Sequence, residues 1–202
     1  MGKLFYVIGK SATGKDTIFQ SLLGQEGLEL KPLVLYTTRP MRAGEQPGVQ
    51  YHFTDEAGLL ALQKEGKVIE LRAYDTVYGV WKYFTADTEA TDLTRHNYAG
   101  IGVLESYRAL RDYYGADRVV PIYIEVEDGE RLQRALDRER AQQEPKYAEL
   151  CRRFLADSED FSEEKLKKAG ICRRFSNAGS LEECLAEIRS FIKEKKGFMN
   201  FS

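Results

Sequence analysis

Apolar residues along this chain fall into short continuous runs that alternate with segments of helical spacing. Continuous runs predict strands that are buried on both faces of a sheet, at residues 4–8, 99–104 and 119–126, and residues 171–176 are expected to form the last strand. Apolar residues three and four apart predict helices from near residue 15, over 105–114, from 129 into the 140s and over 180–195. This alternation predicts an α/β fold of the P-loop NTPase type, in which a parallel sheet carries helices on both faces.

A second pattern interrupts this alternation between residues 33 and 85. In order, it contains a strand at 32–36, a loop rich in Gly, Pro, Arg and Thr at 37–50, a strand at 51–54, a helix at 55–65 and strands at 68–72 and 76–85. The last two alternate apolar or aromatic residues with polar ones, which is typical of antiparallel pairing. We therefore expect a small mixed sheet, inserted after the first strand and helix.

The segment before the last predicted strand is dense in charge. Residues 141–168 contain one proline and many acidic and basic residues, which indicates a helical excursion that carries a mobile lid. We expect the lid region to span residues 137–168. No internal repeat or low-complexity segment is visible, so residues 1–202 are expected to form a single domain.

Composition narrows the possible partners and the compartment. The net charge of −2 implies no broad basic face, so we expect no nucleic-acid partner. No apolar stretch has the length of a signal peptide or a membrane span, so we expect no membrane partner. The three cysteines, Cys151, Cys172 and Cys184, show no C-x-x-C spacing and favour reduced thiols in the cytoplasm over a disulfide framework or zinc site.

The first strand leads into a phosphate-binding motif. The spacing G-x-x-x-x-G-K, from Gly9 to Lys15, lets backbone N–H groups turn onto phosphate oxygens while the lysine reaches the β- and γ-phosphates. The expected ATP-binding residues are Gly9, Ser11, Ala12, Thr13, Gly14, Lys15, Asp16 and Thr17. A purely structural glycine turn is the alternative. Asp16 stands where this motif usually has the Ser or Thr that binds Mg²⁺, so Asp16 is the candidate metal ligand.

Two arginines three residues apart lie in the glycine-rich loop. Arg39 and Arg42 suit a phosphate dianion because guanidinium groups form bidentate, charge-assisted hydrogen bonds with it. Thr38 and Tyr51 can add hydroxyl donors. The alternative is a solvated basic loop in which both arginines pair with acids such as Glu45.

This segment resembles the monophosphate-binding loop of the guanylate kinase family. The residues T-T-R-x-x-R-x-G-E-x-x-G-x-x-Y-x-F follow the phosphate-loop motif in the order that the family has. The resemblance implies that residues 33–85 form the monophosphate-binding subdomain. It also implies that Glu70 reads guanine N1 and N2 and that the Tyr78 hydroxyl contacts the monophosphate.

The implied reaction is transfer of a phosphoryl group from ATP to a nucleoside monophosphate, with GMP as the first choice. No general base is needed because the attacking group is already a phosphate oxyanion; cations must stabilise the transferred charge. The catalytic candidates are Lys15, Arg39, Arg42 and, by similarity to lid arginines, Arg138 and Arg152. The last two could instead belong to a helix face paired with acids such as Glu149 and Asp157.

The chain departs from the family pattern at several positions. Leu35 and Val80 replace polar residues expected near guanine, and residues 99–105 lack the family's D-x-D pair, with Glu105 the nearest acid. These departures keep two alternatives open: a kinase for another nucleotide or phosphorylated metabolite, and a non-catalytic guanylate-kinase-like binding module. The expected ligands are ATP, Mg²⁺ and small-molecule nucleotides, and the chain could be a monomer or a homodimer.

Overall fold

Five parallel strands form the larger sheet of this computed structural model, which describes residues 1–42, 44–76 and 79–197. Their order is β2 (Leu30–Pro32), β7 (Asn97–Gly102), β1 (Leu4–Ile8), β8 (Val119–Glu125) and β9 (Arg174–Ser176). β1 lies at the centre, and the chain continues to both sides of it. Ligands of such sheets bind beyond the carboxyl ends of the strands where the order reverses, so this edge beside β1 is where a site is expected.

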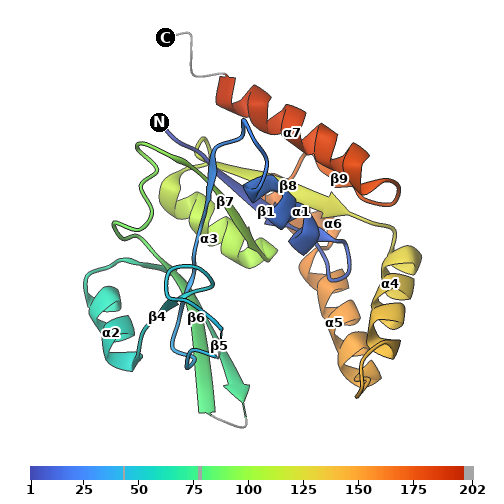
Figure 1. Cartoon of the computed structure of the whole chain (residues 1–202), viewed down its shortest axis with the longest axis horizontal. Coiled ribbons are helices and arrows are strands. Elements are labelled where there is room, and N and C mark those ends of the chain that lie inside the picture. Colours follow the sequence, from blue (N-terminus) through green and yellow to red (C-terminus); the bar gives the residue numbers. More distant parts are fainter. Residues whose placement is uncertain (43, 77–78, 198–202) are drawn as a thin grey trace.

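Helices cover both faces of this sheet, as the sequence predicted (Figure 1). Side chains alternate along β1, so Phe5 and Val7 pack against α1 (Lys15–Leu23) and α7 (Leu181–Gly197). Leu4, Tyr6 and Ile8 face the other way, toward α3 (Leu104–Tyr114) and α6 (Glu163–Lys168). β1 is fully buried because both of its faces are covered.

A second sheet is mixed, as expected. Its order is β4 (His52–Phe53), β3 (Tyr36–Thr37), β6 (Gly79–Ala86) and β5 (Val68–Thr76). β3 and β4 are parallel, whereas β6 is antiparallel to both of its neighbours. Helix α2 (Glu56–Lys64) buries Leu59 against Phe84 and Ala86, which gives this sheet its own small core.

The strand predicted at residues 32–36 is wrong, because the chain changes sheets within it. Residues 30–32 pair with β7 in the large sheet, where Leu33 N–H still donates to Ala99 O at 2.7 Å. His52 N–H then donates to Leu35 O at 2.8 Å, and Tyr36 and Thr37 pair with β4 and β6 in the second sheet. The apolar run is continuous because both of its halves are covered, although by different layers.

The break predicted between residues 72 and 76 is also absent. β5 continues to Thr76 because Ala73, Tyr74 and Asp75 pair with Lys82, Trp81 and Val80 of β6. Cross-strand aromatic and β-branched pairs stabilise such a ladder, even where one strand alone resembles a turn.

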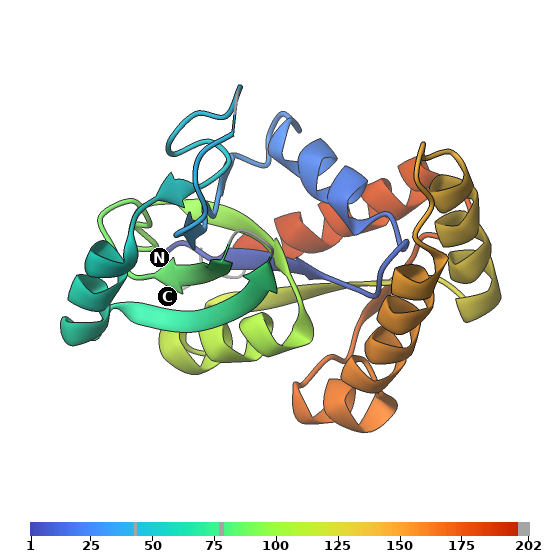
Figure 2. The same ribbon diagram turned by 90° about the horizontal axis from the view of Figure 1, so that it is seen from below.

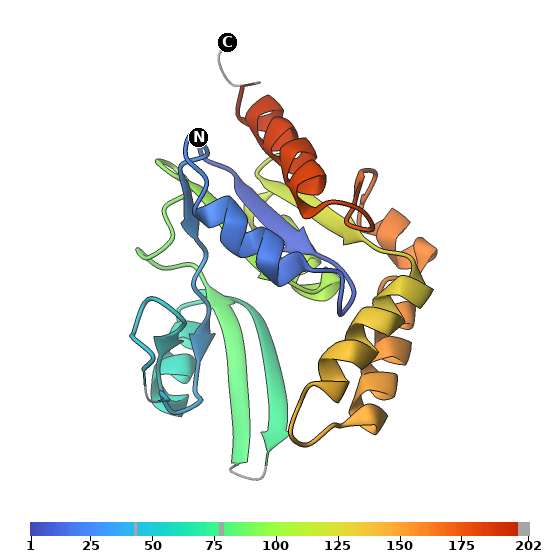
Figure 3. The same ribbon diagram turned by 45° about the vertical axis from the view of Figure 1, so that its right-hand side comes forward.

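Residues 137–168, which are expected to form the lid, contain the end of α4 (Asp128–Arg140) and all of α5 (Tyr147–Asp160) and α6. α4 and α5 are antiparallel and lie beside the large sheet in Figures 2 and 3. α4 is followed by a connection at residues 141–146 and by α5. Glu139 is 3% exposed and accepts hydrogen bonds from Lys146 N and Gln142 Nε2, which shapes that connection. Among the described residues, no helix has both the length and the apolar character needed to cross a membrane.

Candidate functional site

The motif after β1 forms a tight loop that only glycine permits at two positions. A Cβ atom on Gly9 would lie 2.7 Å from Ile124 O, and one on Gly14 would lie 2.5 Å from Asn177 Nδ2. Gly14 also has φ +81°, and Ala12 has φ +65° despite its side chain. The alternating backbone conformations turn successive peptide groups inward, which is the arrangement that creates an anion-binding concavity.

Asn177 stabilises this loop, and the sequence analysis did not identify it. The residue is 6% exposed, and its Nδ2 donates to Thr13 O at 2.8 Å. Thr13 Oγ1 in turn donates to Lys10 O at 2.9 Å. Asn177 directly follows β9, so it lies at the same carboxyl edge of the sheet as the loop. A polar residue that directly follows a predicted parallel strand is the sequence signal that could have identified Asn177.

Lys15 and Asp16 begin helix α1 at the mouth of the loop. Their charged groups lie 3.7 Å apart, and the Lys15 side chain is 19% exposed whereas the Asp16 side chain is 84% exposed. Thr17 is exposed on the same turn. Mg²⁺ commonly takes one or two carboxylates together with substrate phosphates, and the exposed Asp16 carboxylate fits that pattern. No group of three or more His, Cys, Asp or Glu residues within the described part of the chain could hold a metal alone.

Residues 37–53, expected to bind the acceptor phosphate and called the acceptor loop below, hold two arginines that differ in their surroundings. Arg39 is 3% exposed and forms two hydrogen bonds with the Glu45 carboxylate, at 2.7 and 3.0 Å. Glu45 Oε2 also accepts from Arg42 N at 2.7 Å. The Arg42 side chain is exposed and makes no ion pair with the described residues. The sequence analysis gave pairing with acids such as Glu45 as the alternative role of both arginines. The Arg39 side chain does pair with Glu45, whereas Arg42 contacts Glu45 only through its backbone N–H.

Tyrosines surround the buried arginine. The Arg39 guanidinium lies 5.4 Å from the Tyr51 ring centroid, and the Tyr83 ring lies 5.5 Å from that of Tyr51. Burial is the main cause that raises the pKa of Tyr51, so its hydroxyl remains a donor at neutral pH. Tyr83 is a candidate that sequence analysis missed, because the β3–β6 register, which pairs it with Thr37, places it here. Thr38 accepts from Lys82 N at 3.0 Å and so ties the loop to β6.

Glu70 is held within the second sheet. Its carboxylate pairs with Arg72 Nε at 3.0 Å and accepts from Thr85 Oγ1 at 2.9 Å. The register pairs Glu70 with Thr85 and Arg72 with Tyr83, so these four side chains share one face. Val80 pairs with Asp75 and lies on the opposite face. The weaker base discrimination expected from Val80 stays a prediction. Tyr78 lies outside the described residues.

A pocket connects the second sheet with the large one. It is lined by Arg72 and Tyr74 of β5, Glu105 and Arg108 of α3, and Asp160 and Lys165 at the base of the lid. The Tyr6 hydroxyl donates to Ser106 Oγ at 2.9 Å beside Gly102, where β7 ends, and burial raises the pKa of Tyr6 to about 12. The pocket therefore places a mixed set of cations and acids next to the expected edge of the large sheet.

The lid arginines also differ. Arg138 is exposed on α4 and makes no ion pair with the described residues. Arg152 of α5 pairs with Glu149 at 2.7 Å. This is the helix-face pairing that the sequence analysis gave as the alternative to a contact with phosphate. Asp157, also considered as a partner of these arginines, pairs instead with Arg131.

Comparison with known proteins identifies similar sequences and one similar fold. A family model described as guanylate kinase matches residues 1–163. Guanylate kinase of Legionella pneumophila (strain Lens) is 31% identical over 123 residues, which is 60% of this chain and 53% of that protein. Guanylate kinase of Chromohalobacter salexigens is 40% identical over 80 residues, 39% of this chain and 36% of that protein. The chain therefore spans about half or less of the length of these two relatives.

A solved structure of guanylate kinase from Anaplasma phagocytophilum superposes with a TM-score of 0.64. It covers 97% of this chain and 87% of its own, with 18% sequence identity. At 18% identity, this similarity shows that the two chains share a fold and shows nothing about function.

Proposed function

The chain belongs to the guanylate kinase family, and from this premise we propose that it transfers the terminal phosphoryl group of ATP to GMP. The observation that carries the proposal is that two anion-binding elements occur in one chain. The glycine loop after β1 provides inward-facing peptide groups next to Lys15, and the acceptor loop provides Arg39, Arg42 and Tyr51. Phosphoryl transfer between two nucleotides requires cationic groups around both.

The assignment of roles follows the chemistry of each element. Lys15 and the peptide groups from Gly9 to Gly14 bind the ATP phosphates, with Mg²⁺ held by Asp16 and the phosphates. Arg39 and Arg42 bind the acceptor phosphate, assisted by Tyr51 and Tyr83. Magnesium supplies charge neutralisation on the transferred group when it is bound.

Glu70 is the proposed reader of the base. A carboxylate offers about four lone-pair positions, and Arg72 Nε, Arg72 Nη2 and Thr85 Oγ1 use three of them. One position on Oε2 stays open for a guanine N–H donor, and a second guanine donor would replace the 3.4 Å contact from Arg72 Nη2. Adenine presents an acceptor at N1, which a carboxylate repels. Two exposed thiols, Cys151 and Cys172, and the buried Cys184 are all unpaired, which supports a reducing compartment such as the cytoplasm.

A coupled assay of ADP release tests this proposal. The full chain is incubated with ATP and Mg²⁺ and offered GMP, dGMP, AMP, CMP, UMP or dTMP in turn. We expect turnover with GMP and dGMP that exceeds turnover with AMP by at least about 100-fold, because an unpaired buried polar group costs about 1–3 kcal/mol per contact.

Each result has a clear meaning. Comparable turnover with AMP would contradict the proposed reading of the base by Glu70, but it would agree with phosphoryl transfer to nucleoside monophosphates. Binding of ATP without turnover on any monophosphate would contradict the proposed reaction, and the Lys15→Ala variant controls for contaminating kinases.

A further inference from the structure

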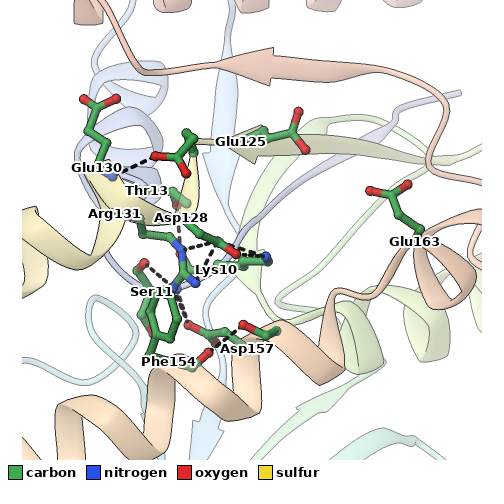
Figure 4. A network of polar contacts seen from close by, with 12 residues as sticks. Lys10, Ser11, Thr13, Glu125, Asp128, Glu130, Arg131, Phe154, Asp157 and Glu163 are labelled. Carbon is green, nitrogen blue, oxygen red and sulfur yellow. Dashed lines mark hydrogen bonds and ion pairs between the residues drawn. The ribbon is translucent and has the colours of Figure 1, made fainter.

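An acidic side chain of the lid lies at the phosphate loop (Figure 4). Ser11 N–H donates to Asp157 Oδ2 at 2.6 Å, although the two residues are 146 positions apart. Asp157 is on α5 and its side chain is 18% exposed. Inward-facing peptide N–H groups of such a loop are the donors that phosphate oxygens use. A carboxylate of the chain itself therefore occupies one donor of the anion site.

Arg131 of α4 fixes this arrangement from the other side. Its side chain is 1% exposed, and Nη1 donates to Ser11 O at 3.2 Å and lies 3.3 Å from Asp157 Oδ2. Its Nη2 lies 3.0 Å from Asp128 Oδ1, and its guanidinium lies 4.3 Å from the Phe154 ring centroid. The Ser11 backbone is thus held at its N–H by Asp157 of α5 and at its C=O by Arg131 of α4.

The charges of this network balance without a ligand. Lys10 Nζ lies 3.1 Å from Asp128 Oδ1, so two cations, Lys10 and Arg131, face two carboxylates, Asp128 and Asp157. A phosphate that enters the loop adds negative charge beside Asp157 and needs the same peptide donor. Phosphate and Asp157 cannot both occupy it, because the Ser11 N–H offers a single hydrogen.

We propose that Asp157 is an internal competitor of the ATP phosphates, and that its displacement couples ATP binding to movement of α5. The inference rests on the proposed function in one respect, namely that ATP binds at this loop. When Asp157 leaves Ser11, Arg131 keeps Asp128 and gains the phosphate as its second anionic partner. α5 also carries Arg152 and Arg153, so the same displacement repositions the arginines of the lid.

Binding measurements on the full chain test the competition. ATP and inorganic tripolyphosphate are titrated into the wild type and the Asp157→Asn variant by calorimetry, without GMP. We expect about fivefold tighter binding of both ligands to the variant, because a neutral amide competes for an N–H donor less strongly than a carboxylate. Glu159→Gln removes the same charge from the same helix at a side chain that is 83% exposed, and we expect less than a twofold change there.

The outcomes separate local competition from other causes. Equal tightening in both variants would overturn the proposal in favour of a long-range charge effect. Unchanged or weaker binding to Asp157→Asn would overturn it in favour of a structural role. Absence of ATP and tripolyphosphate binding to the wild type would overturn both this inference and the proposed function, whereas binding without transfer to GMP would overturn the proposed function alone.

Hydrogen exchange on the wild type provides a second measurement, which does not depend on a variant that folds. On addition of tripolyphosphate, we expect amides at residues 9–17 to gain protection and amides at residues 147–160 to lose it. Equal or greater protection of residues 147–160 would overturn the coupling.

Discussion

Arg72 Nε lies 3.0 Å from Glu70 Oε2, and the two residues share one face of β5 because they are two positions apart. The pair is largely shielded from water, with Glu70 8% and Arg72 22% exposed. Arg72 therefore aligns the carboxylate that is proposed to read the base. The same ion pair gives Glu70 a part in the stability of the fold, in addition to its proposed contact with the base.

Removal of Arg72 is expected to destabilise the chain. Arg72→Ala leaves a buried carboxylate without its cation, so we expect a loss of about 1–3 kcal/mol in the free energy of unfolding and a Tm lower by about 2–4 °C per kcal/mol. Thermal unfolding of the purified variant measures this. Lys168→Ala is the control, because its pair with Glu164 is exposed on both sides and we expect less than about 1 kcal/mol there. Equal losses in the two variants would contradict the importance of burial at Glu70.

Arg42 tests whether the arginines of the acceptor loop bind the acceptor phosphate. Arg42→Ala removes an exposed guanidinium without breaking a side-chain ion pair, so we expect an unchanged Tm and unchanged ATP affinity. The rate of transfer to GMP should fall by about 100-fold or more, because charge-assisted contacts to phosphate are lost. Steady-state kinetics with GMP and ATP varied separately measure this. Arg39→Ala also breaks the buried pair with Glu45 and should lower the Tm as well. Met41→Ala, at an exposed neighbour, is the matched control. An Arg42→Ala rate equal to that of Met41→Ala would exclude a role of Arg42 in binding the acceptor phosphate.

Local sequence was sufficient to predict the phosphate loop and the layers of the fold. The spacing from Gly9 to Lys15 is a pattern within seven consecutive residues, and the continuous apolar run of β1 directly reports two covered faces. The strand at 32–36 could not be placed correctly, because an apolar run does not say which sheet provides its hydrogen bonds.

The missed site residues all depend on register or on tertiary packing. Tyr83 lies beside the loop of Arg39 because β6 pairs with β3, which sets Tyr83 opposite Thr37. Asn177 and Asp157 reach the phosphate loop from more than 140 residues away in the sequence. Side chains of this kind follow no local periodicity, so pattern analysis cannot rank them above other polar residues.

Asp16 is expected to set the magnesium requirement. The carboxylate is exposed beside Lys15, where it can bind the cation together with ATP phosphates. Asp16→Ser should shift the Mg²⁺ titration of GMP phosphorylation, measured at saturating ATP and GMP. Glu26→Gln, at an exposed residue outside the helix, provides a charge-matched control. Superimposable magnesium curves for the wild type and Asp16→Ser would exclude the carboxylate as a ligand.

Arg138 is the lid arginine that we propose contacts phosphate. It is exposed on α4 and is not engaged by an ion pair in the described chain, whereas Arg152 is held by Glu149. We expect Arg138→Ala to lower kcat about 100-fold with little change in the KM for GMP, because it acts on charge that develops during transfer. Arg140→Ala, whose guanidinium lies 3.8 Å from Asp137, is the control on the same helix. A rise in KM with an unchanged kcat would place Arg138 in substrate binding instead.

His52 should make the stability of the second sheet depend on pH. Burial lowers its pKa from 6.5, and its ring lies 4.7 Å from that of Tyr36. Below pH 6.5 the unfolded chain therefore binds more protons at this position than the folded chain does, so stability falls as the pH falls through 6.5 toward the lowered pKa. Above that range, His52 is neutral in both states and adds no dependence. Thermal unfolding of the wild type and His52→Gln between pH 5 and 8 should show a smaller decrease in Tm for the variant on the acid side. His96→Gln keeps His52 and should follow the wild type. Parallel curves for all three proteins would show that other groups govern the acid response.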